Sequence, residues 1–342
     1  MTVKTLPLKD ALAKLALPAT DRNLFSSPEW MKVIVCTYGT RIFVKYIERD
    51  AKVSSYVFYT VVKNFLEWKI CLCSYCDYCD GYVNCAQDWE DFFQDFRREY
   101  PSYRIAVRNL RDDLVRANPH FQLLSQEWFH LLNLQDSLEA IWNRTHESFR
   151  SAVKQGKKKE ISVRVCEKKY LADFYRLHLR LRKNKYRVFP QPLAFFENIW
   201  NEYMERKKGF MLGAFFREQL VAANIYLECG NTLYYKFNTS DLSATHLRPN
   251  NVLFWEGIEL AKKRGLEYLD LGSSGLEQKG LILFKEHAGV KGQYIFHLGF
   301  APPGFKFSKK RILKAFTTIC TRPWMPEAAV RWGSQIIYPY LA

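Results

Sequence analysis

The stretch from Tyr234 to Asp270 changes its hydrophobic period at Pro249, and this change restricts the fold more than any other part of the chain. Before it, residues 232–239 read TLYYKFNT, which is aromatic and β-prone, whereas apolar side chains after it recur at helical spacing. Proline suits the first position of a helix, and Gly265, directly after three basic residues, suits its end. The sequence therefore predicts a strand, a polar loop, a helix and a second strand, YLDLG.

The start of this predicted helix is a candidate anion-binding site. A helix that follows a strand presents unpaired backbone N–H groups and positive potential at its first turn. His246 and Arg248 immediately precede this turn and add side-chain donors. Two interpretations follow: the segment binds a phosphate-bearing ligand, or it is an ordinary βαβ unit in an α/β core.

Length and composition describe a folded protein with a basic surface. The 342 residues correspond to about two domains. Apolar residues make up 48% of the chain, which allows a substantial core, and the formal net charge is +16. Such a charge attracts nucleic acids, anionic lipid surfaces or nucleotide-activated substrates. No apolar run is long enough for a membrane-spanning helix, and the N-terminal residues are too charged for a signal peptide, so we expect a cytoplasmic protein.

The nine cysteines raise the question of a metal site or of disulfides. Cys73, Cys76 and Cys79 have the C-x2-C-x2-C spacing that occurs in iron–sulfur proteins. The nearby candidate for a fourth ligand is Cys85, at a looser spacing, and no histidine lies close in the sequence. An odd number of cysteines without a secretory signal indicates free thiols in a reducing compartment. We therefore expect no metal ion.

The order of predicted elements divides the chain into two α/β halves and a tail. Residues 1–145 combine strands with a helix, DWEDFFQDFRREY, and residues 146–306 begin with a basic helix and the strand ISVRV. Two helices, a three-stranded meander and the strand–loop–helix–strand segment described above follow. The tail, residues 307–342, mixes basic and aromatic side chains, so it either packs back on the N-terminal domain or rests on an anionic membrane.

Three segments of the second half carry a family resemblance. They read FYRLHLRLRKNKYRVFPQPLAFFENIW, LRPNNVLFWEGIELAKKRGLEYLDLGSS and LFKEHAGVKG. Together they resemble the Fem-type (FemABX-like) branch of the GNAT superfamily, and most closely its members associated with exopolysaccharide or exosortase systems. The resemblance implies an α/β (α+β) fold with two tandem GNAT-like domains, each a mixed, largely antiparallel sheet flanked by helices.

The resemblance also implies a chemistry. Members of this family transfer an acyl or aminoacyl group to an amine, with acyl-CoA such as acetyl-CoA or aminoacyl-tRNA as the donor. In a GNAT core two neighbouring strands part, and their free backbone N–H groups can stabilise the oxyanion that forms. The acetyl-CoA signature of the superfamily, Arg or Gln followed by x-x-Gly-x-Gly or Ala, is absent; SATHLRPNNV stands in its place.

Three residues at the predicted strand ends and in the loop are candidate catalytic groups. We expect Tyr235 to protonate a leaving group, Asp270 to accept a proton from the attacking amine, and His246 to act as a base or a phosphate donor. Each also has a purely structural interpretation. Tyrosines at such positions pack in cores, an aspartate at a strand end can cap the next segment, and a loop histidine can be incidental.

Candidate substrate-binding residues surround these groups. Arg150, Lys154 and Lys157 share one helical face, which suits a polyanionic acceptor or a tRNA acceptor stem, although a solvated basic face has the same pattern. The resemblance places Lys285 near a phosphate-bearing substrate. The remaining candidates are Tyr186, which would close over the acceptor, Asn238 beside the donor, and Arg248 and Asn250 at the start of the helix.

These observations predict an N-acyltransferase that modifies an amine of an amino-sugar or peptidyl precursor of the cell envelope or of a polysaccharide. We expect the amine-bearing substrate to be anionic and linked to a nucleotide or a lipid. tRNA is a candidate partner, and the inner face of the membrane is a candidate docking surface. The alternative is a non-catalytic GNAT-fold protein that binds RNA or an anionic glycan, which would account for the net charge.

Overall fold

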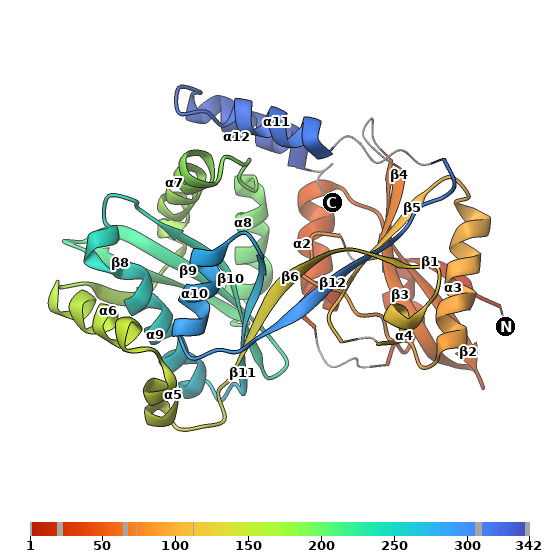
Figure 1. Ribbon diagram of the computed structural model, residues 1–342, viewed down its shortest axis with the longest axis horizontal. Helices are drawn as coiled ribbons and strands as arrows, with labels where there is room; N and C mark the ends of the chain where they lie inside the picture. The colour runs from red at the N-terminus through yellow and green to blue at the C-terminus, as the bar shows by residue number, and fades with distance from the viewer. Residues whose placement is uncertain are drawn as a thin grey trace. The chain divides into compact units, whose positions relative to one another are not determined.

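The structure is a computed structural model that describes residues 2–18, 23–63, 68–72, 74–111, 113–304 and 310–338. Contacts divide the chain into unit 1, which comprises Met1–Glu127, Tyr294–Ile312 and Pro339–Ala342, and unit 2, which comprises Trp128–Gln293 and Leu313–Tyr338. Each unit contains a mixed, largely antiparallel sheet flanked by helices (Figure 1), which confirms the predicted fold class.

Unit 1 has the strand order β1-β2-β3-β4-β5-β12. Strands β4 and β5 are parallel, and the other pairs of this unit are antiparallel. Its core forms where Trp89, Phe92 and Phe96 of α3 pack against the sheet. The elements are β1 (Lys4–Pro7), α1 (Leu8–Lys14), α2 (Pro28–Tyr38), β2 (Ile42–Arg49), β3 (Lys52–Lys63), β4 (Trp68–Leu72), α3 (Ala86–Glu99), β5 (Arg104–Asn109), α4 (Asp113–Ala117) and β12 (Gly292–Phe300).

Unit 2 has the strand order β6-β11-β10-β9-β8-β7, and its meander of β8, β9 and β10 matches the prediction. The strands are β6 (Gln122–Asn133), β7 (Ser162–Val165), β8 (Gly209–Phe216), β9 (Gln219–Cys229), β10 (Thr232–Ser240) and β11 (Tyr268–Gly275). The helices are α5 (Leu138–Arg144), α6 (Glu147–Lys158), α7 (Leu171–Leu181), α8 (Leu193–Ile199), α9 (Pro249–Lys263), α10 (Lys279–His287), α11 (Lys310–Cys320) and α12 (Glu327–Ile337). A π-helical turn, η3 (Arg182–Tyr186), extends α7.

Helix α9 begins and ends where its local chemistry predicts. Pro249 occupies the first turn, and Gly265 after the last turn has the left-handed φ of +74° that glycine adopts without strain. The helix lies close against β9, because a Cβ atom at Gly257 would come within 2.2 Å of the phenol oxygen of Tyr226. On its other side α9 contacts α6. The N-terminal end of α9 is therefore fixed relative to the sheet by packing along the whole helix.

The two units differ in their limits from the predicted domains 1–145, 146–306 and 307–342. Because β6 and β12 each contribute residues to both units, the chain crosses the division twice within strands. Within the described residues α12 contacts α7 and belongs to unit 2, and the packing of the tail on the N-terminal domain stays a prediction. Residues 305–309, where this tail begins, and residues 339–342 lie outside the described part of the chain.

Candidate functional site

Strands β10 and β11 run parallel for three residue pairs and then separate. The pairs are Thr232 with Tyr268, Leu233 with Leu269, and Tyr234 with Asp270. Within the described register no later pair joins the two strands, although β10 stays paired with β9 as far as Ser240 and β11 continues to Gly275. The facing edges of both strands therefore have backbone groups that do not bond to each other beyond Asp270, as the predicted GNAT core requires.

A β-bulge follows immediately on β10. The register with β9 shifts between Tyr235 and Phe237, so these two side chains lie on opposite faces of the sheet. The Tyr235 ring contacts Phe254 of α9 at 5.6 Å between centroids, whereas Phe237 contacts Phe195 of α8 at 5.5 Å. The bulge thus directs the Tyr235 phenol toward the face that α9 covers.

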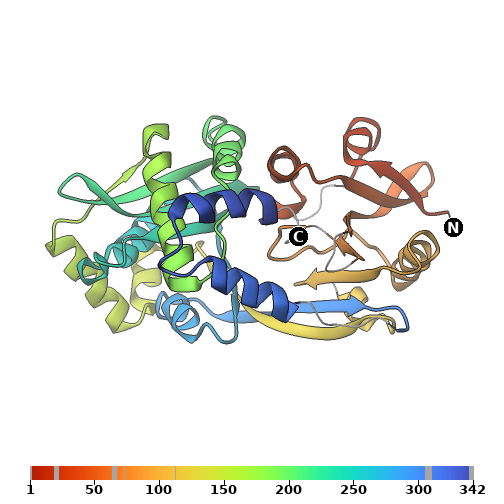
Figure 2. The same cartoon turned by 90° about the horizontal axis from the view of Figure 1, so that it is seen from above.

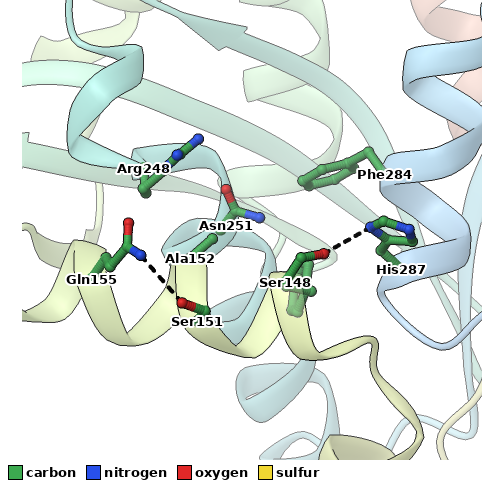
Figure 3. A pocket seen from close by; sticks show the side chains of 9 residues that line it. Ser148, Ser151, Ala152, Gln155, Arg248, Asn251, Phe284 and His287 are labelled. Carbon is green, nitrogen blue, oxygen red and sulfur yellow. Dashed lines mark hydrogen bonds between the residues drawn. The ribbon is translucent and has the colours of Figure 1, made fainter.

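A cavity of about 430 Å³ lies on this face, between α6, the start of α9 and α10 (Figure 3). Its volume is within the range of small-molecule sites. Arg248 and Asn251 line it at the N-terminal end of α9, where a helix favours anions. The other lining residues, from α6 and α10, are Ser148, Phe149, Ser151, Ala152, Gln155, Phe284 and His287.

The loop before α9 uses much of its own backbone hydrogen bonding. The amides of Ala244, Leu247 and Arg248 donate to carbonyl oxygens within the loop, and the amide of Ser243 donates to the Asp241 carboxylate. A glycine-rich loop would instead aim such amides at a phosphate. Arg248 has a left-handed φ of +60° and exposes its side chain. The residues present thus fit an anionic group mainly through side chains and the first turn of α9.

Ser148 and His287, which line the cavity, contact a second imidazole, that of His146. The Ser148 hydroxyl lies 3.0 Å from Nδ1 of His287 and 2.8 Å from Nδ1 of His146. The two imidazole rings stack with centroids 4.2 Å apart. Because the backbone N–H of Ser148 also donates to Nδ1 of His146, this nitrogen is an acceptor. Figure 3 shows the bond between Ser148 and His287.

Three asparagines connect β9, β10 and the start of α9. Nδ2 of Asn238 donates to Oδ1 of Asn224 at 2.7 Å and to Oδ1 of Asn250 at 3.2 Å. Nδ2 of Asn250 in turn donates to the Ser240 hydroxyl at 3.3 Å. This amide chain ties the separated end of β10 to the first turn of α9, and it brings together two predicted site residues, Asn238 and Asn250.

The predicted catalytic residues occupy three different environments. Burial raises the pKa of Tyr235 well above its usual value, and the neighbouring phenols of Tyr226 and Tyr186 raise it further, so its hydroxyl stays protonated. Asp270 is buried, and its carboxylate accepts the backbone N–H of Gly272 at 2.7 Å. His246 is exposed, donates from Nδ1 to the Ser243 carbonyl oxygen, and does not line the cavity.

The basic face predicted on α6 does not face this cavity. Arg150 donates to backbone carbonyl oxygens at the end of α5, including that of Trp142. Lys157 forms an ion pair with Glu256 at 2.8 Å. Lys154 and Lys157 border a separate, apolar cavity of about 340 Å³ with Trp142 and Trp255. Arg150 and Lys157 thus contribute to the packing of α5, α6 and α9. The binding of a polyanion by Arg150, Lys154 and Lys157 stays a prediction.

Lys285, which was predicted to lie near a phosphate-bearing substrate, is buried. It is only 2% exposed, and its Nζ donates to the carbonyl oxygen of Gly272 at 3.0 Å and to the hydroxyl of Ser274 at 2.8 Å. A lysine with these bonds holds the end of β11 and is not presented to a phosphate from solvent. Tyr186, by contrast, is 40% exposed and available to a ligand.

Sequence reasoning missed most of the cavity lining. Ser148, Ser151 and Gln155 recur three and four residues apart, so they share a face of α6 next to the basic one. That spacing of small polar residues was the available signal. Phe284 and His287 lie in the LFKEHAG motif, one residue before and two residues after Lys285. The prediction named only Lys285 from this motif.

The cysteines of the first unit do not form a metal site in the described ranges, where no group of three or more His, Cys, Asp or Glu residues could hold an ion. Cys76 and Cys85 are free thiols, as expected, but Cys79 is disulfide-bonded, which corrects the expectation for that residue. Cys73 lies outside the described residues.

Over the described residues, the helices are all too short or too polar to cross a membrane.

Comparisons with known proteins agree with this geometry. Residues 143–279 match the family model of the acetyltransferase (GNAT) domain. No curated protein sequence matches the chain. The crystal structure of FemX is similar with a TM-score of 0.67 and 12% identity, covering 93% of this chain and all of FemX. A tandem GNAT protein from the clavulanic acid biosynthesis pathway has a TM-score of 0.55 and 8% identity, covering 90% of this chain and all of that protein.

A third similar structure is L-PGS from Bacillus licheniformis, with a TM-score of 0.52 and 11% identity, covering 86% of this chain and 96% of that one. At these identities the similarity establishes the fold alone. Residues 143–279 thus match the acetyltransferase (GNAT) domain, and the chain has the fold of FemX and of tandem GNAT proteins.

Proposed function

We propose that the protein is an N-acyltransferase whose donor binds at the separated ends of β10 and β11. The observation that carries the proposal is the end of the parallel ladder at Tyr234 and Asp270, together with a cavity at the N-terminal end of α9. Parted strands offer backbone N–H groups to a carbonyl oxygen, and the helix end offers positive potential to a phosphate. Both features are needed to hold an activated acyl compound.

The donor is either an acyl-CoA such as acetyl-CoA or an aminoacyl-tRNA. Either one, when bound, supplies an activated carbonyl and phosphate groups. Arg248 and Asn251 would hold phosphate, with Ser151 and Gln155 of α6 as further hydrogen-bonding groups. The backbone amides of the loop before α9 already donate hydrogen bonds within the loop. We therefore expect side chains, and not these amides, to hold the donor.

Tyr235 is the proposed proton donor to the leaving group. Its raised pKa keeps the phenol protonated at physiological pH, and the bulge turns it toward the face of α9. Asp270 accepts the Gly272 amide and so fixes the turn of β11, where Gly272 has φ of +65°. We assign Asp270 and Lys285 to positioning of this strand, and catalysis mainly to orientation of the reactants and oxyanion stabilisation.

The acceptor we propose is the amine of an amino-sugar or peptidyl precursor of the cell envelope or of a polysaccharide, modified in the cytoplasm. The sequence motifs resemble Fem-type proteins associated with exopolysaccharide systems, and the fold is similar to that of FemX. A net charge of +16 suits an anionic acceptor. Tyr186 is exposed, and it is near enough to Tyr235 to raise the pKa of that phenol. It is therefore the candidate for contact with the acceptor.

The test is a matrix of donors and amines. Purified protein is incubated with acetyl-CoA, longer acyl-CoAs and charged tRNAs, each with a panel of amino sugars and peptides, and amide products are identified by mass spectrometry. We expect consumption of one donor class that depends on the amine. If no donor is consumed, while RNA or an anionic glycan binds with a steep dependence on salt, the protein is a binding module and not a transferase.

A further inference from the structure

Helices α11 and α12 form a helical hairpin that is attached to unit 2 by polar contacts. Figure 2 shows them as two dark-blue helices joined by a turn. Lys183 donates to the carbonyl oxygen of Pro323 at 3.1 Å, and Arg187 donates to that of Thr321 at 3.1 Å. Glu327 of α12 pairs with Arg180 of α7 at 3.0 Å. The hairpin is thus held by hydrogen bonds and an ion pair at the end of α7.

The hairpin exposes most of the large apolar side chains that the structure describes in it. Its buried residues are Val330 and the hydroxyl residues Thr317, Thr321 and Ser334, and the Ser334 hydroxyl donates to the Pro190 carbonyl oxygen at 2.5 Å. A helix on a soluble protein normally turns its large apolar side chains inward. Here they are exposed: Phe316 (47%), Ile319 (50%), Trp324 (66%), Trp332 (67%) and Ile336 (47%).

The charge of the hairpin specifies what could cover this face. Between Lys310 and Tyr338 the sequence has one acidic side chain, Glu327, and it is already paired with Arg180. Arg322 and Arg331 are exposed basic residues of the same segment. The sequence of the segment also contains Lys310, Arg311 and Lys314. Tryptophan beside lysine and arginine is the composition that membrane interfaces favour, because indole rings prefer the headgroup region and cations are attracted to anionic lipids.

We propose that the α11–α12 hairpin docks the protein on an anionic membrane surface, with Trp324 and Trp332 inserted among the headgroups. A second copy of the chain fits this face less well. A two-fold interface would place the same basic residues opposite one another, and like charges oppose such contact. A bilayer with anionic lipids both buries the apolar side chains and neutralises the basic ones.

Membrane binding is measured on the full chain by co-sedimentation with phosphatidylcholine vesicles, with or without an equimolar amount of phosphatidylglycerol. We expect binding to the anionic vesicles only, weakened by salt. The variant Trp324→Ser/Trp332→Ser should bind at least about tenfold more weakly, because two exposed indoles no longer insert. A matched control, Leu12→Ser/Leu123→Ser, removes two exposed apolar side chains elsewhere and should bind like the parent.

A charge variant separates the two contributions. Arg322→Gln/Arg331→Gln should weaken binding to anionic vesicles about tenfold or more. The proposal is overturned if the parent binds neither vesicle, binds both equally, or loses no affinity in the tryptophan variant. It is also overturned if light scattering shows a dimer that the tryptophan variant abolishes while vesicle binding is absent. None of these outcomes depends on acyl transfer, so they leave the proposed function untouched.

Discussion

Tyr234 of β10 and Asp270 of β11 form the last pair of a parallel ladder that is only three pairs long. Beyond this pair β10 remains paired with β9, and β11, whose other neighbour is β6, continues to Gly275. Asp270 and Lys285 both bond to the residues that follow on β11, at Gly272 and Ser274. Specific polar contacts therefore fix the part of β11 that follows the last pair with β10.

Arg248 is predicted to bind the phosphate of the donor. We expect Arg248→Ala to raise the KM for the donor by about tenfold or more, because one charge-assisted hydrogen bond is lost, while the free energy of unfolding stays unchanged. The measurement is initial rate against donor concentration at low and high salt. Lys263→Ala removes a cation from the opposite end of α9 and should behave like the parent; an equal loss in both variants would contradict a specific contact.

Lys285 is predicted to act on stability. Lys285→Ala leaves the Gly272 carbonyl and the Ser274 hydroxyl without their buried partner, so we expect a loss of about 2 to 4 kcal/mol in the free energy of unfolding in urea. Lys279→Ala, at an exposed position of the same helix, should cost much less. Parent-like stability with a raised donor KM would instead return Lys285 to a phosphate-binding role.

Tyr235 is predicted to donate a proton in the reaction. We expect Tyr235→Phe to lower kcat by about 100-fold with little change in the donor KM or in stability. Because burial holds its pKa well above 10, the parent should show no loss of rate from deprotonation of this phenol up to about pH 10. Tyr59→Phe removes a buried phenol in the core of unit 1 and serves as the control, since Tyr59 lies on β3 and not at the ends of β10 and β11.

Two buried histidines predict a dependence of stability on pH. Burial lowers the pKa of His178 to about 3 and that of His130 to about 4, from 6.5. Both imidazoles therefore stay neutral in the folded protein but take up protons on unfolding. Their contribution to stability is complete above pH 6.5 and is lost as the pH falls toward 4 for His130 and 3 for His178, at about 1.4 kcal/mol per pH unit for each.

Urea unfolding between pH 7 and pH 5 checks this dependence. His178→Gln should unfold with a shallower slope of free energy against pH than the parent. The control variant His246→Gln replaces an exposed histidine. Equal slopes in all three proteins would mean that His178 is accessible to protons in the folded state.

Local chemistry made some elements predictable. Pro249 and Gly265 predict where α9 begins and ends, because each residue acts on the helix end next to it. Alternating apolar residues predict the meander of β8, β9 and β10. The same reasoning identified Arg248, which lines the cavity, and Asn238 with Asn250, which bond to each other. These residues are near the loop in sequence, so their proximity follows from connectivity.

The sequence by itself determined the α/β class, the order of elements in the second half and the position of the helix end that faces the cavity. Only the tertiary structure decided where β10 and β11 part, that α6 presents Ser148 and Gln155 instead of Lys154 to the cavity, and that Lys285 is buried against β11. Helix ends depend on neighbouring residues, whereas strand register and side-chain burial depend on contacts between segments far apart in the chain.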